Sequence, residues 1–201
     1  MWVACVRLMW PIMAASVLLL PLPAAPTTSG PKTVTVQLQN NGSAALTSVT
    51  VQYTLNGGAA VSQTFTGLNI APTATGTVSF TTQASLAGGA NAFVLTASLP
   101  NGTADPTPTN NVLNVTVYTA LNGAYTINNL GTASGTNFLS FTAAAAALNN
   151  GGVSGPVTFT VSNGPYTEQI ELLAISGTSS TNRVIFNGGG RTIRFGSANT
   201  N

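Results

Sequence analysis

The feature that most constrains this chain is a strict alternation of apolar and polar residues in its first half. In 33–39 the apolar residues are Val34, Val36 and Leu38, separated by threonine or glutamine, and 49–55 repeats the spacing. Side chains two residues apart lie on one face of a β-strand, so this pattern predicts strands with one face on a core. Further strands are expected at 59–66, 76–82, 91–98 and 112–118.

Turn residues separate these predicted strands, among them Asn56-Gly57, Ala71-Pro72 and Asn101-Gly102. Six or seven short strands at this spacing favour a β-sandwich over 33–118. Asn56-Gly57 predicts a tight hairpin, because both residues tolerate positive φ. No helix is expected in this half, since apolar residues do not recur every three or four positions.

The chain is nearly uncharged, which excludes several classes of function. Its 201 residues are 44% hydrophobic and carry a net charge of +2, so the chain should fold instead of remaining disordered. So few cations, without a basic stripe, disfavour nucleic-acid binding. The charged residues are Arg7, Lys32, Asp105, Glu168, Glu171, Arg183, Arg191 and Arg194.

The N-terminal segment 1–25 has the pattern of a bacterial export signal. Arg7 precedes an apolar run, and small residues follow, so we expect cleavage after Ala24. The run is too short for a stable membrane span, and contact with a membrane is expected only through this signal. A misassigned start or the end of a preceding domain is the alternative. Residues 26–32 are predicted to be a linker, and Cys5, the only cysteine, allows no intrachain disulfide.

A family resemblance is carried by two segments within 33–118, TVTVQLQNNGSAALTSVTVQYTLNGG and ADPTPTNNVLNVTVY. They resemble CARDB, a cell-adhesion-related domain of bacterial surface proteins. In that family the first strand ends in Asn-x-Gly, here Asn40-Asn41-Gly42, and an acidic, Asn-rich loop precedes the last strand, here Asp105 to Asn111. The resemblance implies a seven-stranded immunoglobulin-like sandwich that serves as a spacer or adhesive module. The loop carries a single acid, which argues against calcium binding there.

The second part, 119–201, differs in pattern. A short strand is expected at 122–129, and an alanine-rich helix near 138–149, with Thr136 and Asn137 as capping residues and a stop at Asn149 to Gly152. Four apolar strands then recur, and we expect the fourth to stack on the first in a parallel β-helix. These strands are predicted at 157–161, 169–173, 183–186 and 191–195.

The stretch from Gly123 to Gly188 resembles the N-terminal cap and first coil of pectin-lyase-like right-handed β-helix domains in large secreted Bacteroidetes proteins. The resemblance spans about 122–201 and implies that the helix caps the open end of the β-helix, while GPYTEQI turns the chain from one sheet to the next. Because a solenoid needs about three stacked repeats for stability, we expect this chain to be part of a longer protein.

No catalytic, cofactor or metal site is expected. The chain has no histidine, and Cys5 has no partner base, so only carboxylate chemistry remains. Glu168 and Glu171 are the only local pair, and on a strand they would point to opposite faces instead of flanking a glycosidic bond. We therefore interpret them as solvated turn and strand-edge residues.

Other candidate residues also have structural explanations. The arginines at 183, 191 and 194 are expected on the surface of the coil, and Asp105 in a turn. Gly188-Gly189-Gly190 is expected to be a turn, because no Lys-Ser/Thr follows it. The sequons at Asn41, Asn101 and Asn114 are interpreted as accidental. The aromatic residues expected in the core are Tyr53, Phe65, Phe80, Phe93 and Tyr118.

Two functions remain open. The first is a non-catalytic, extracellular adhesion, spacer or display module of a bacterial surface protein, whose partners would be cell-surface glycans or other surface proteins. The alternative is the N-terminal portion of a carbohydrate-active β-helix enzyme, a polysaccharide lyase or hydrolase, with its catalytic coils beyond residue 201. A binding module for acidic glycans, using the C-terminal arginines, is a third possibility.

Overall fold

The computed structural model describes residues 15–19, 27–105 and 108–195. Within these residues the chain forms two compact units. The first contains 15–19, 31–85 and 91–117, and the second contains 27–30, 86–90 and 118–195.

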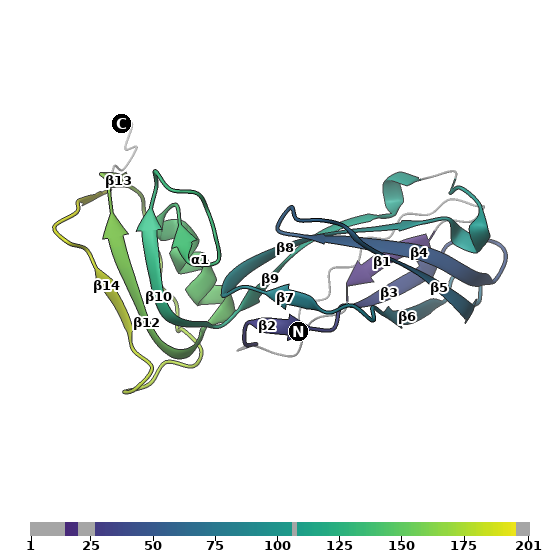
Figure 1. The fold of residues 1–201 in the computed structure, drawn as a ribbon, viewed down its shortest axis with the longest axis horizontal. Coiled ribbons are helices and arrows are strands. Elements are labelled where there is room, and N and C mark those ends of the chain that lie inside the picture. Colours follow the sequence, from purple (N-terminus) through teal and green to yellow (C-terminus); the bar gives the residue numbers. More distant parts are fainter. Residues whose placement is uncertain (1–14, 20–26, 106–107, 196–201) are drawn as a thin grey trace, which may run out of the picture. The chain divides into compact units, whose positions relative to one another are not determined.

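The first unit is an immunoglobulin-like β-sandwich (Figure 1). One sheet has the strand order β5-β4-β8-β9 and the other β1-β3-β6, while β2 pairs with β7. The pairings of β3 with β1 and β6, and of β4 with β5 and β8, are antiparallel. The strands are β1 (Ala15–Leu19), β2 (Gly30–Lys32), β3 (Thr35–Asn40), β4 (Leu46–Leu55), β5 (Val61–Ile70), β6 (Thr75–Ser79), β7 (Ala84–Leu86), β8 (Gly89–Ser98) and β9 (Val112–Thr119).

All six strands predicted from the alternation are confirmed, as β3, β4, β5, β6, β8 and β9. Two short 3-10 turns, Pro100–Gly102 and Pro108–Asn110, lie between β8 and β9. In β3 and β8 every second residue is buried, as a half-buried strand requires.

Aromatic rings join the two sheets of the sandwich. Tyr53 on β4 meets Phe80, just after β6, edge to face, with ring centroids 4.9 Å apart. Tyr53, Phe80 and Phe93 are buried, as predicted, whereas Phe65 and Tyr118 are only partly buried. Burial raises the pKa of Tyr53 above its ordinary value of 10.0, which keeps the phenol neutral inside the core.

The predicted Asn56-Gly57 hairpin is confirmed. Both residues have positive φ, 51° and 71°, and the Gly58 N–H donates to the Leu55 carbonyl at 2.9 Å. Asn56 also ties the turn to β8, because its side-chain oxygen and its backbone N–H both bind the backbone of Ala92 at 2.8 Å. The turn therefore fixes the register of β4 against two neighbours.

The N-terminal predictions differ from the structure in two places. Gly30–Lys32, the end of the predicted linker, forms β2, a three-residue ladder too short to show a period-two pattern. Ala15–Leu19, inside the predicted export signal, forms β1, with Leu19 paired to Val36 and Ala15 to Asn40. The remainder of 1–25 lies outside the described residues.

The second unit contains one helix and two parallel sheets (Figure 1). One sheet has the order β11-β10-β12-β14, and the other pairs β13 with β15. Its buried core lies between the helix and the larger sheet. The elements are β10 (Leu121–Asn128), β11 (Asn137–Phe138), α1 (Phe141–Gly151), β12 (Val153–Ser162), β13 (Tyr166–Thr167), β14 (Val184–Asn187) and β15 (Ile193–Arg194).

Both parallel sheets share one register. Val157 pairs with Val184, and Tyr166 pairs with Ile193, so in each sheet the partner lies 27 residues further along the chain. The prediction that 191–195 stacks on 157–161 is therefore wrong, because 183–186 contains the strand that does so. The observed register places valine on valine and Phe159 on Phe186, so like side chains stack.

The strand predicted at 169–173 is also absent, since these residues have no regular secondary structure. The helix prediction is correct in kind but shifted in position. Its N-cap is Ser140, whose side chain accepts from the Ala143 N–H, instead of Thr136 or Asn137. Asn137 begins β11, so sheet pairing excludes it from the helix. The helix ends at Gly152, as expected, where φ is 68°.

Asn40, the first residue of the Asn-x-Gly motif, organises the end of β3. It is 3% exposed, and its side-chain oxygen accepts from the Gly42 N–H at 2.9 Å. Its side-chain nitrogen donates to the carbonyls of Ala44 and Ile70, both at 2.8 Å. One carboxamide thus satisfies three backbone groups where the chain leaves the sheet.

We predict that Asn40→Ala lowers the free energy of unfolding by about 2 to 3 kcal/mol, because buried backbone groups lose their partners. Urea unfolding followed by circular dichroism measures the change. Asn114→Ala, on the exposed side of β9, is the matched control and should change stability by less than about 0.5 kcal/mol. Equal effects of the two substitutions would contradict this role for Asn40.

Candidate functional site

Glu168 anchors the N-terminus of α1. Its two carboxylate oxygens accept from the backbone N–H groups of Phe141, at 3.1 Å, and Thr142, at 2.7 Å, and the Thr142 hydroxyl donates to it at 2.6 Å. A carboxylate is favourable there because the first helical N–H groups lack partners within the helix. The structure corrects the sequence interpretation: Glu168 binds a helix instead of being a solvated turn residue.

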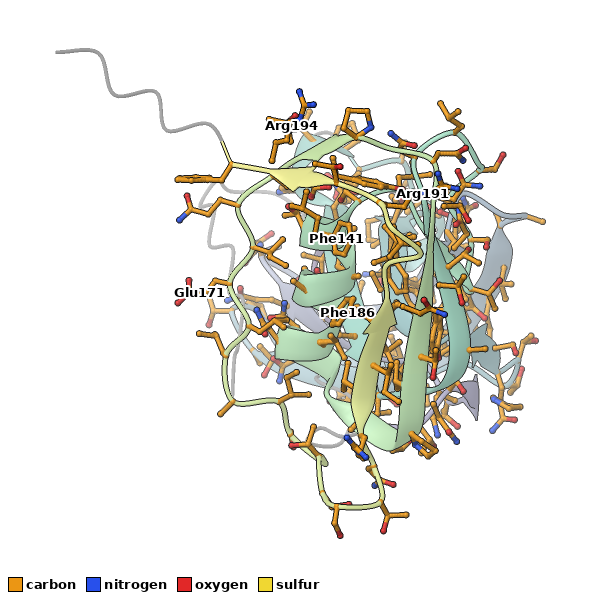
Figure 2. The ribbon with its side chains drawn as sticks, turned by 90° about the vertical axis from the view of Figure 1, so that its left-hand side faces the viewer. Phe141, Glu171, Phe186, Arg191 and Arg194 are labelled. Atoms are coloured by element: carbon orange, nitrogen blue, oxygen red, sulfur yellow. The ribbon has the colours of Figure 1, made fainter. Side chains whose placement is uncertain are left out.

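Glu171 lies on the long segment between β13 and β14, and its side chain is exposed. Figure 2 shows it pointing outward, apart from Arg191 and Arg194. The backbone of this segment is held by Asn149, whose side chain binds the Glu171 carbonyl at 2.8 Å and the Leu173 N–H at 3.0 Å. The two carboxylates therefore do not act on a common point, because one is bound to the helix and the other faces outward.

The C-terminal arginines are exposed, as predicted from the sequence. Arg194 lies on β15, and Arg191 follows the Gly188–Gly190 turn, which is closed by a 2.9 Å hydrogen bond from the Arg191 N–H to the Gly188 carbonyl. Figure 2 shows both arginines at one end of the last coil. They form a small cationic area without an apolar pocket around it among the described residues.

The sequons differ in accessibility. Asn101 is the most constrained, since its side-chain oxygen accepts from the N–H groups of Thr47 and Ser48 and from the Thr47 hydroxyl. Its side-chain nitrogen donates to the Ala45 carbonyl at 2.9 Å. The nitrogen that a glycan would occupy thus holds the 100–102 turn to β4. Sequence reasoning missed this role, as it missed that of Asn149, because the partners lie more than 20 residues away.

Two searches of the described residues complete the survey. Within 15–19, 27–105 and 108–195, no helix is long and apolar enough to cross a membrane. In the same ranges, no three or more His, Cys, Asp or Glu side chains gather as they would around a metal ion.

The sandwich can be placed by comparison with known families. The family model of CARDB matches residues 20–115, which spans nearly all of the first unit. Residues 20–115 form a CARDB domain. CARDB is a cell-adhesion-related, non-catalytic module, and this assignment confirms the sequence-based resemblance for the first half of the chain. The β-helix resemblance of the second half has no such match.

Two solved structures are similar to part of the chain. One is the crystal structure of a CARDB domain from Pyrococcus furiosus in complex with di-metal ions; it is 17% identical, with a TM-score of 0.37, and covers 56% of this chain and 92% of that one. The other is a solution NMR structure of a CARDB domain from the same organism, 15% identical with a TM-score of 0.40, covering 65% and 100%. No curated protein sequence matches the chain.

The loop before β9 does not supply a full set of metal ligands. Asp105 accepts a hydrogen bond from the Asn111 side-chain nitrogen at 2.8 Å, and the side-chain oxygens of Asn110 and Asn111 are buried without a hydrogen-bond partner. These residues offer one carboxylate and two amide oxygens, whereas Ca²⁺ takes roughly six to eight oxygen ligands. The donors of this loop therefore do not fit a calcium ion, and no step of function is derived through a metal.

We predict that Glu168→Gln destabilises α1 by about 1 kcal/mol, because the variant loses a charge at the helix N-terminus and turns an amide donor toward backbone donors. Hydrogen exchange of the helix amides measures the loss. Glu171→Gln removes the same charge from an exposed position and should leave exchange in the helix unchanged. A helix equally protected in both variants would contradict the anchoring role.

Proposed function

We propose that this chain is a non-catalytic adhesion, spacer or display module of a secreted or surface-bound bacterial protein. The CARDB domain at 20–115 is the observation that carries the proposal, because that family is cell-adhesion-related. The near absence of charge is compatible with a passive module, whose surface polarity comes from hydroxyl and amide groups. Its partners would be cell-surface glycans or other surface proteins.

We further infer that the second unit opens a right-handed parallel β-helix that acts as a stalk or display surface. The equal 27-residue offset in two separate parallel sheets supports this inference, since a solenoid repeats its strands at a constant step. Right-handedness is expected because parallel strands joined by a crossover adopt that hand in nearly all sheets. The position of α1 on the core of the larger sheet is compatible with a cap.

The same coil keeps the enzyme hypothesis open for a longer form of the protein. Pectin-lyase-like enzymes place their catalytic residues on later coils, so a first coil would look alike in both cases. Within the described coil, Glu168 already binds three donors of the helix N-terminus and is poorly placed for proton transfer. The proposal therefore assigns no catalytic role to this part of the chain.

We predict that the purified chain releases no unsaturated uronates or new reducing ends from polygalacturonate, chondroitin sulfate or alginate. Ultraviolet absorbance and reducing-end assays provide the measurement, with a commercial lyase as positive control. Product that increases with the concentration of the chain, and that disappears in Glu168→Gln or Glu171→Gln, would contradict the non-catalytic proposal.

The proposed export raises a question about Ala15–Leu19. These residues pair with β3 in the structure, yet they lie in the middle of the proposed signal. Removal of the signal would take β1 away and leave β3 as an edge strand, because β3 lies between β1 and β6. The two fates exclude each other, so the N-terminus of the mature protein decides between them.

We predict that a bacterial host exports the chain and cleaves it after Ala24, because an apolar run followed by small residues is typical of an export signal. N-terminal sequencing of the exported protein gives the cleavage site. A control in which Leu18 and Leu19 are replaced by arginine should remain inside the cell. Recovery of an exported chain that retains Ala15–Leu19 would show instead that β1 belongs to the mature domain.

A further inference from the structure

The last coil is far less buried than the rest of the second unit. Among the described residues, Tyr166 is the final buried position, and every residue from 167 to 195 is at least partly exposed. Several of these are large and apolar, with Ile185 48%, Ile193 45% and Phe195 62% exposed. This coil thus has the composition of a core without the burial of one.

A ladder of aromatic rings runs through the coil and ends at β14. The register places Tyr125, Phe159 and Phe186 on successive strands at one position. The rings of Tyr125 and Phe159 lie 5.7 Å apart, and those of Phe159 and Phe186 4.8 Å apart with an angle of 15°. Phe186 is only partly buried, although it also stacks on Phe141, and Figure 2 shows these two rings between the helix and β14.

Both sheets end on this coil within the described residues. β14 is the outer strand of the larger sheet, and β15 is the second strand of the smaller one. An outer strand presents backbone N–H and C=O groups that can pair with another strand. Here two such edges belong to one coil and share one register, so a single further coil could pair with both.

We propose that this open end, defined as β14, β15 and the exposed part of Phe186, binds a further parallel β-coil that follows the present one along the chain. The inference deepens the proposed β-helix and rests on it. The occupant would carry an aliphatic and an aromatic residue 27 positions after Val184 and Phe186, which extends the existing stacking of Val157 on Val184 and Phe159 on Phe186.

A second copy of the chain fits this end less well. Two copies related by a two-fold axis would pair β14 with β14 in antiparallel orientation, which breaks the parallel register. A head-to-tail copy would have to offer the opposite edge of the sheet, where β11 has only two residues against four in β14. A consecutive coil satisfies both the direction and the length of the edge.

The test appends a second copy of residues 168–194 directly after Arg194 of the full chain. The copied valine and phenylalanine then fall 27 positions after Val184 and Phe186. We expect amide exchange in 184–187 to slow by about tenfold or more, because an outer strand becomes an inner one. The matched control carries the same appended copy with its valine and phenylalanine replaced by aspartate, and should give no added protection.

Three outcomes would overturn the docking proposal: no added protection from the appended copy, equal protection from the control copy, or protection of 184–187 that depends on the concentration of the unextended chain. The last would identify a second copy as the occupant. Failure of the proposed β-helix is distinguishable, because the unextended chain would then lack protection in β12 and β14 relative to β10. Docking alone fails if that protection is present but does not spread.

Discussion

The structure depends on the need to pair every buried backbone N–H and C=O group in a chain with very few charges. Ladders satisfy these groups within the sheets, but not where strands end. Asparagine side chains do so there, since a carboxamide offers the same donor and acceptor as a peptide group. Asn40, Asn56 and Asn101 bind the backbone at chain reversals of the sandwich, and Asn149 does so beside the helix of the second unit.

The two units solve the burial problem differently, although both consist mainly of strands. The sandwich uses antiparallel strands that alternate between core and solvent, and its core is closed on both sides by sheets. The second unit stacks parallel strands at a constant offset, so its core extends along the stacking direction and is complete only where a further coil or the helix covers it. The first kind of core is self-contained, whereas the second invites extension, which agrees with a module joined to a stalk.

The few charged residues illustrate how such a module differs from an enzyme. Glu168 is bound by helix N–H groups and Asp105 by Asn111, so these two carboxylates take part in local structure. Catalytic carboxylates need instead a shared cleft and a substrate between them. The CARDB assignment of the first half is consistent with this distribution of charge.

The sequence alone determined the elements whose cause is local. Period-two alternation gave the six main strands of the sandwich, Asn56-Gly57 gave its hairpin, and the alanine run with Gly152 gave the helix and its end. Only the tertiary structure decided which strand stacks on 157–161, because parallel register depends on the length and path of the connecting segments and on ring stacking between distant residues. The same holds for Glu168, whose partners lie 26 and 27 residues earlier in the sequence and become neighbours only when the coil closes on the helix.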